Sequence, residues 1–148
     1  MAFRNDILVT KLRLGDNKRV DDGVFDATIT LGAEAANAIK VSIQLLDARG
    51  KAVTERIAVE AYLSSDSHGD ALVAPSATLT IAASTNGIAI PYSAANSAGH
   101  TAMKLVSEAA GTVDVSITET SGAATYYLVL VSPITGKLIV SGAITFAA

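Results

Sequence analysis

The strongest signal in this sequence of 148 residues is an alternation of apolar and polar side chains with a period of two. Successive side chains of a β-strand point to opposite faces of its sheet, so this period predicts half-buried strands. Residues 112–119 show it most clearly, because Val113, Val115 and Ile117 alternate with polar side chains. The same alternation, or a short apolar run, predicts strands in eight further segments: 24–31, 39–46, 56–63, 77–81, 87–90, 102–108, 125–131 and 137–146.

Short turn sequences separate these segments: 47–50, 86–87, 109–111, 121–122 and 135–136. Each turn sequence contains a glycine, which supplies the positive φ that tight turns need. Seven to nine short strands joined by such turns predict an all-β chain, an antiparallel β-sandwich of the immunoglobulin-like (Ig-like) type. Residues 125–131 are apolar on both faces, which indicates a central or doubly covered strand. A bend is expected at Gly142, and only 33–38 and 92–100 could hold a turn or two of helix.

Charge is concentrated at the N-terminus, where residues 1–22 carry nine of the 25 charged side chains. This shift predicts an extended N-terminal arm, 1–22, followed by one Ig-like domain, 23–148. Apolar side chains such as Ile7 and Val9 would let the arm add a strand to a sheet edge, its own or a neighbour's. The alternative is a first strand of the fold itself behind a frayed terminus.

The composition argues against several classes of function. The chain has no cysteine, which excludes a disulfide framework, an iron–sulfur site and a thiol nucleophile. A net charge of -3 and a pI near 5.2 argue against binding nucleic acid through its phosphates. No apolar run approaches the length of a membrane span, and the first residues lack the apolar core of a secretion signal. We therefore expect a soluble protein made in the cytoplasm, with neither nucleic acid nor membrane as partner.

The loop 64–70 is the best candidate for a metal site. Asp66, His68 and Asp70 could offer two carboxylates and an imidazole to a divalent cation. However, Ser, Asp and Gly are also what an exposed loop uses for its own turns, and the full ligand set of a calcium cage is missing. We therefore predict no metal site, with these three residues as the only candidates.

Catalysis finds little support in the sequence. His68 and His100 are the only two histidines, and no serine lies in a nucleophile signature. No glycine-rich loop joins a strand to a helix with a following lysine, so a phosphate cradle is not expected either. We predict no enzyme, no catalytic residues and no cofactor.

Two stretches carry a family resemblance. Residues 39–51 read IKVSIQLLDARGK and residues 107–115 read SEAAGTVDV, which resembles the strand–turn course of bacterial and phage Ig-like domains. With the later run YLVLV at 127–131, the chain from 39 to 146 is similar to the head-decoration (cement) proteins of tailed bacteriophages. The resemblance covers about three quarters of the chain, and its motifs specify the fold more strongly than the role.

That resemblance implies a structural virion protein on the outer capsid surface, which stabilises the shell by bridging major capsid protein subunits. Its partners would be the major capsid protein and neighbouring copies of itself, as a dimer or trimer. The arm is the expected contact, because its mixed charges suit ion pairs to another protein. Its candidate partner-binding residues are Arg4, Ile7, Val9, Lys11, Arg13, Lys18 and Arg19.

The alternative function is a receptor- or glycan-binding Ig-like module of a phage tail or fibre. Carbohydrate sites usually present exposed aromatic side chains beside polar loops. Tyr62 and Tyr92, near the loops 64–70 and 91–101, are the only plausible pair in this sequence.

Overall fold

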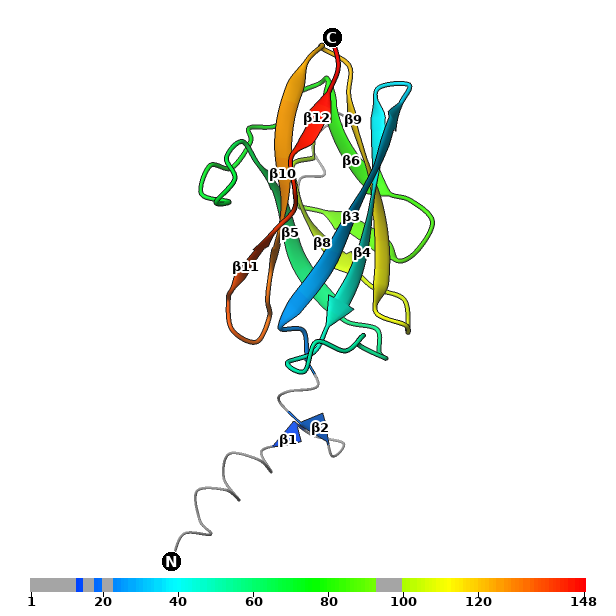
Figure 1. Ribbon diagram of the computed structural model, residues 1–148, viewed down its shortest axis with the longest axis vertical. Coiled ribbons are helices and arrows are strands. Elements are labelled where there is room, and N and C mark those ends of the chain that lie inside the picture. The colour runs from blue at the N-terminus through cyan, green and yellow to red at the C-terminus, as the bar shows by residue number, and fades with distance from the viewer. Residues whose placement is uncertain (1–12, 15–17, 20–22, 93–99) are drawn as a thin grey trace, which may run out of the picture.

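The computed structural model describes residues 13–14, 18–19, 23–92 and 100–148, with side chains from residue 23 onward. Within these residues the chain contains no helix, and two antiparallel sheets face each other as a β-sandwich (Figure 1). The first sheet has the order β3 (Asp26–Ala35), β4 (Ala38–Leu46), β9 (Thr112–Glu119), β6 (Leu79–Ala83). The second has the order β11 (Leu138–Val140), β10 (Ala124–Val131), β5 (Ala58–Ser64), β8 (Ala102–Val106), β7 (Ile88–Pro91), and β12 (Ile144–Phe146) also pairs with β10.

The strand order can be compared with the Ig arrangement. In the constant-type Ig fold, strands A, B, E and D face strands C, F and G. Here β3-β4-β9-β6 correspond to A-B-E-D, and β5, β10 and β11 correspond to C, F and G. The hairpin of β7 and β8 extends the second sheet beyond β5, which the constant-type arrangement lacks. The antiparallel sandwich is thus confirmed, and the Ig-like assignment stays a prediction.

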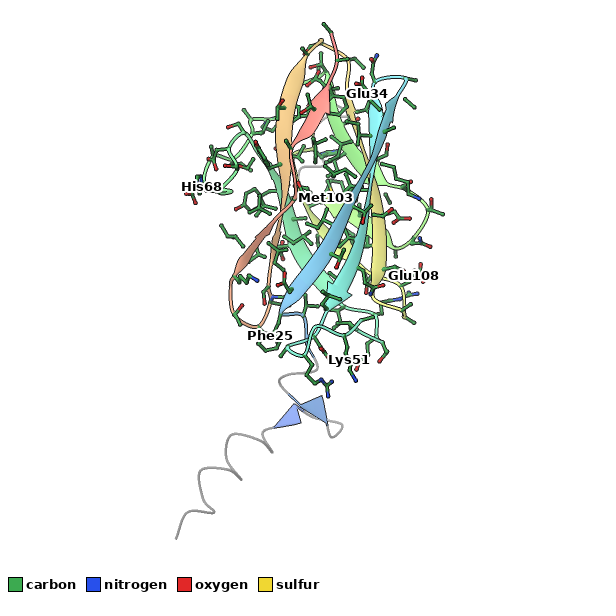
Figure 2. The ribbon with its side chains drawn as sticks, in the orientation of Figure 1. Phe25, Glu34, Lys51, His68, Met103 and Glu108 are labelled. Atoms are coloured by element: carbon green, nitrogen blue, oxygen red, sulfur yellow. The ribbon has the colours of Figure 1, made fainter. Side chains whose placement is uncertain are left out.

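The core lies between the two sheets and is built by the alternation that the sequence shows. The inward side chains of β4, β5 and β9 are almost completely buried: Ile39, Val41, Ile43, Leu45, Val59, Ala61, Leu63, Val113, Val115 and Ile117. Met103 of β8 lies in the middle of the sandwich (Figure 2). Burying each Leu, Ile or Val side chain contributes roughly 1.5–3 kcal/mol, so these inward faces hold the sheets together.

Strand 125–131 is central, as predicted, and its outer face is covered at Val129. β10 lies between β5 on one side and β11 and β12 on the other. Leu128 and Leu130 face the core, whereas Val129 is fully buried beneath Gly69 of the loop after β5. The last strand is interrupted at Ser141 and Gly142, where the register with β10 shifts by one residue between β11 and β12. The bend expected at Gly142 is therefore present.

Two expectations need correction. The described sandwich has ten strands rather than seven to nine, because the last segment splits and every short candidate pairs. Residues 33–38 hold no helical turn. They complete β3, turn at Ala36 and Asn37, whose φ angles are 49° and 61°, and begin β4. Two successive positive φ angles are those of a type I′ turn, which matches the twist of a hairpin.

The described residues include three buried acids, Asp47, Asp114 and Glu119, and Glu119 connects the two sheets. Glu119 at the end of β9 is 3% exposed, and its carboxylate accepts hydrogen bonds from the Tyr126 hydroxyl (2.7 Å) and the Ser121 N–H (2.8 Å). Burial alone would raise the pKa of Glu119, but these hydrogen bonds outweigh it and lower the pKa to about 2. Burial, followed by the bond to the carboxylate, raises the pKa of Tyr126 to about 12. The pair connects the ends of two strands in opposite sheets.

Candidate binding surface

The outer faces of the two sheets differ in chemistry. On the four-stranded sheet, the outward side chains of β9 and of the middle of β4 are polar, and apolar side chains occur only at the two ends of β4, Ala38 and Leu46. The polar ones are Lys40, Ser42, Gln44, Thr112, Asp114, Ser116 and Thr118. Thr28 and Thr30 of β3 are exposed beside them. Asp114 is itself held by Lys40 (3.1 Å) and by the Asn86 side chain (2.8 Å). This face presents a hydrogen-bonded, polar surface to water.

The outer face of the six-stranded sheet carries large exposed apolar side chains around one charged pair, Glu60 and Lys104. Ile88, Ile90 and Tyr92 follow one another on the outward side of β7 and beyond its end, and they are 50%, 47% and 54% exposed. Leu138 of β11 and Leu72 of the loop after β5 border the same face. Of the six large hydrophobic side chains found exposed in the described residues, these five lie on this side. We call them the apolar face.

A hollow lies within this face, between two tyrosines. The strand registers place Val129, Tyr62 and Ala102 in one cross-strand row. Tyr92 continues the row, because its N–H donates to the carbonyl of Ala102 (3.3 Å). Ala102 carries only a methyl group between two large rings, so a hollow of about 270 Å³ opens above it. It is lined by Glu60, Ala61, Tyr62, Gly69, Asp70, Leu72, Tyr92 and Ala102, and we call it the tyrosine hollow.

Tyr62 is held in place by the loop beside it. Its hydroxyl donates a hydrogen bond to the Gly69 carbonyl (2.8 Å). Burial raises the pKa of Tyr62, and the negative charges of Asp70 and Asp66 raise it further. Gly69 has a φ of 86°, and a Cβ there would lie 3.2 Å from Val129, so the loop packs tightly on the sheet. One wall of the hollow is therefore packed against the sheet.

Asp66, a candidate metal ligand, organises this loop instead. Its Oδ1 accepts hydrogen bonds from the N–H groups of His68 (2.7 Å), Gly69 (2.8 Å) and Asp70 (3.2 Å). Burial alone would raise the pKa of Asp66, but these backbone bonds outweigh it and lower the pKa. His68 lies at the outer end of the loop and is exposed (Figure 2). Among residues whose side chains are described, no three His, Asp or Glu residues are grouped so as to hold a metal ion.

Calcium is therefore expected to leave the protein's melting temperature unchanged. One of the two Asp66 carboxylate oxygens already accepts three backbone N–H groups, and a ligand stabilises a fold only if it binds the folded state. Thermal unfolding with millimolar CaCl₂ and with EDTA tests this. A melting temperature that rises with calcium, and no longer does so in Asp70→Asn, would revive the metal site.

The structure brings only part of the predicted contact set into view. Arg13, Lys18 and Arg19 belong to β1 (Arg13–Leu14) and β2 (Lys18–Arg19), which pair in antiparallel fashion. The other arm residues, Arg4, Ile7, Val9 and Lys11, lie outside the described residues. His100 is half-buried and distant in sequence from the loop of His68.

The alternation pattern of the sequence does not predict the apolar face. Residues 87–90 indicate a strand, but alternation alone does not say which side faces solvent. A usable signal exists, since Ile88, Ile90 and Tyr92 are large whereas Ala89 and Pro91 between them are small. Large residues on the open side of a short edge strand would have suggested a contact surface.

No helix in the described part of the chain has the length and hydropathy needed to cross a membrane. No protein-family model, curated protein or solved structure matches the chain.

Proposed function

We propose that this chain is a structural virion protein that binds the outer surface of a phage capsid and stabilises it by bridging major capsid protein subunits. Its support is the resemblance of residues 39–146 to decoration proteins, together with one structural observation. That observation is the asymmetry of the sandwich, with a polar outer face on one sheet and the apolar face on the other. Exposed apolar patches on a folded protein mark interaction sites more often than scattered apolar residues do.

The apolar face suits attachment to a protein shell. Ile88, Ile90 and Tyr92 form one line along an edge strand, so a partner surface can cover all three at once. Burying half-exposed side chains of this size contributes on the order of 1 kcal/mol each. The affinity of one such contact is modest. When several contacts attach to a symmetric shell at once, the overall affinity is much higher than that of one contact. The arm then adds ion pairs, or a strand, to the same attachment.

A capsid-binding assay tests this proposal. Capsids stripped of the protein are incubated with purified variants and sedimented, and the bound fraction gives an apparent Kd. We expect Ile90→Lys to weaken binding about tenfold or more, because it places a charge in a contact that excludes water. Deletion of residues 1–22 is expected to weaken binding as well. Thr30→Lys adds the same charge to the polar face of the other sheet and should bind like the unmodified protein.

Two results would contradict the proposal. If the unmodified protein does not sediment with capsids, the decoration role is wrong. If Ile90→Lys and Thr30→Lys bind equally well, the apolar face is not the contact. Unchanged binding after deletion of residues 1–22 would remove the arm from the attachment.

One observation favours the alternative, a glycan-binding module of a tail or fibre. The two tyrosines that it requires, Tyr62 and Tyr92, do line the same hollow. A glycan array and the position of the protein on the particle distinguish the two roles. Many copies on the head support decoration, whereas a few copies at the tail support adhesion.

A further inference from the structure

We propose that the tyrosine hollow binds a basic side chain, arginine or lysine, presented by the protein on which this chain docks. The inference rests on the proposed function, because that function supplies a protein partner, and it adds the chemistry by which the partner is recognised. Three features of the hollow support it: its shape, its charge and its hydrogen-bonding groups.

The shape fits a narrow chain between two rings. Tyr62 of β5 and Tyr92 beyond β7 stand on either side of Ala102, two strand spacings apart, which is about 9.6 Å between backbones. The Ala102 methyl group forms the floor, and Leu72 adds an apolar wall. The methylene stem of arginine or lysine packs against such surfaces while its charged end stays at the rim.

The charge at the hollow is negative. Glu60 and Asp70 lie in its lining. One cation, Lys104, stands 3.9 Å from Glu60, with both side chains about half exposed, so the two carboxylates outnumber it. The Asp70 side chain has no hydrogen bond or ion pair to any residue that the structure describes. The faces of the tyrosine rings also attract cations, because the electron density of an aromatic ring concentrates above and below its plane. Carboxylate and ring faces thus attract the same kind of group.

The hydrogen-bonding groups select a donor-rich ligand. The two carboxylates can only accept hydrogen bonds when they are ionised, and the Tyr62 hydroxyl already donates to Gly69. A guanidinium or ammonium group donates and never accepts, so it matches this set. A sugar carries acceptors in equal number, and among the lining side chains only the Tyr92 hydroxyl would be left to serve them. This balance favours a basic side chain over the glycan of the alternative function.

Nuclear magnetic resonance on the full chain tests the inference without capsids. The probe is the peptide acetyl-Gly-Arg-Gly-amide, and its matched control carries citrulline, which has the shape of arginine without the charge. We expect the arginine peptide to shift the ring signals of Tyr62 and Tyr92 and to bind about fivefold more tightly than the citrulline peptide. Tyr92→Ala and Asp70→Asn should each weaken arginine binding about two- to fivefold. Glu34→Gln removes one carboxylate from β3, in the other sheet, and should change nothing.

Three outcomes would overturn the inference. The citrulline peptide could bind as tightly as the arginine peptide. Methyl pyranosides could shift the two tyrosine signals while the arginine peptide does not, which would support the glycan module. The third outcome is that neither the arginine peptide nor the methyl pyranosides shift the two tyrosine signals at about 50 mM, an upper range for weak side-chain contacts.

These results are separable from those of the proposed function. If capsids bind through the apolar face and the arginine peptide does not bind, only the inference fails. If the arginine peptide binds and capsids do not, the decoration role fails and the hollow remains a site for basic side chains.

Discussion

Replacing Gly111 with alanine is expected to lower the free energy of unfolding by about 3 kcal/mol. Gly111 forms the turn between β8 and β9 with a φ of 73°, where side chains are strained. A Cβ there would lie 2.5 Å from the carbonyl oxygen of Val53, a distance that real Cβ atoms do not tolerate. The N–H of Val53 donates a hydrogen bond to the carbonyl of Leu45 (3.0 Å), so the Val53 backbone cannot move freely away from the added Cβ.

Gly50→Ala is the matched control. Gly50 has nearly the same φ, 74°, but a Cβ there would meet nothing within 4 Å. Gly50→Ala should therefore lower the free energy of unfolding only by the cost of the backbone conformation, about 1 kcal/mol. Urea unfolding followed by circular dichroism measures both variants. Equal losses in the two would show that the contact with Val53 relaxes, and that the turn is looser than its geometry indicates.

The second large effect is the pH dependence that Glu119 imposes on stability. Its pKa is lowered from 4.5 to about 2 in the folded protein, so folding favours the ionised form. The resulting stabilisation is fully present above pH 4.5 and is lost as the pH falls through about 2. A shift of this size corresponds to about 3 kcal/mol, an order-of-magnitude figure. We expect the free energy of unfolding, measured with urea, to fall by that amount as the pH is lowered from 4.5 to about 2.

Two variants isolate this contribution. Glu119→Gln keeps the shape and loses the charge, so it should be less stable than the unmodified protein near neutral pH and equally stable at pH 2. Tyr126→Phe removes the donor at 2.7 Å and should cost about 1–3 kcal/mol near neutral pH. Tyr127→Phe changes the next residue of β10, on the opposite face of the sheet, and serves as control. A stability gap for Glu119→Gln that does not close with falling pH would contradict the assignment.

The alkaline side provides an independent check on the same pair. The pKa of Tyr126 is raised to about 12, so folding favours its neutral form. This stabilisation is fully present below the ordinary tyrosine pKa of 10 and is lost as the pH rises through about 12. Absorbance of tyrosinate should therefore show a last ionisation step near pH 12, and Tyr126→Phe should remove that step.

The sequence was most informative where local and long-range preferences agree. Strand 112–119 was predicted with the bounds that β9 has, because its alternation coincides with one buried and one polar face. The turn at Ala36 and Asn37 was missed because it contains no glycine, the usual marker of positive φ. There the pairing of β3 with β4 holds alanine in a conformation that its own preference disfavours.

The binding surface depended more on tertiary structure. Tyr62 and Tyr92 were recognised as an aromatic pair, but only the register of β5, β8 and β7 places them on either side of Ala102. Asp66 suggested a metal ligand, since a carboxylate in a loop can bind either a cation or backbone N–H groups. Which of these it does depends on the loop's conformation, which the Asp66 hydrogen bonds and the packing of Gly69 on Val129 set.

The sequence by itself determined that the chain is all-β, which side chains share a face of each strand, and that cysteine chemistry is absent. Only the tertiary structure decided which outer face is polar and which is apolar, and where the hollow lies. The physical reason is that a period of two is a local property of the extended backbone. The exposure of a face and the neighbours of a side chain are set by pairing between strands far apart in the chain.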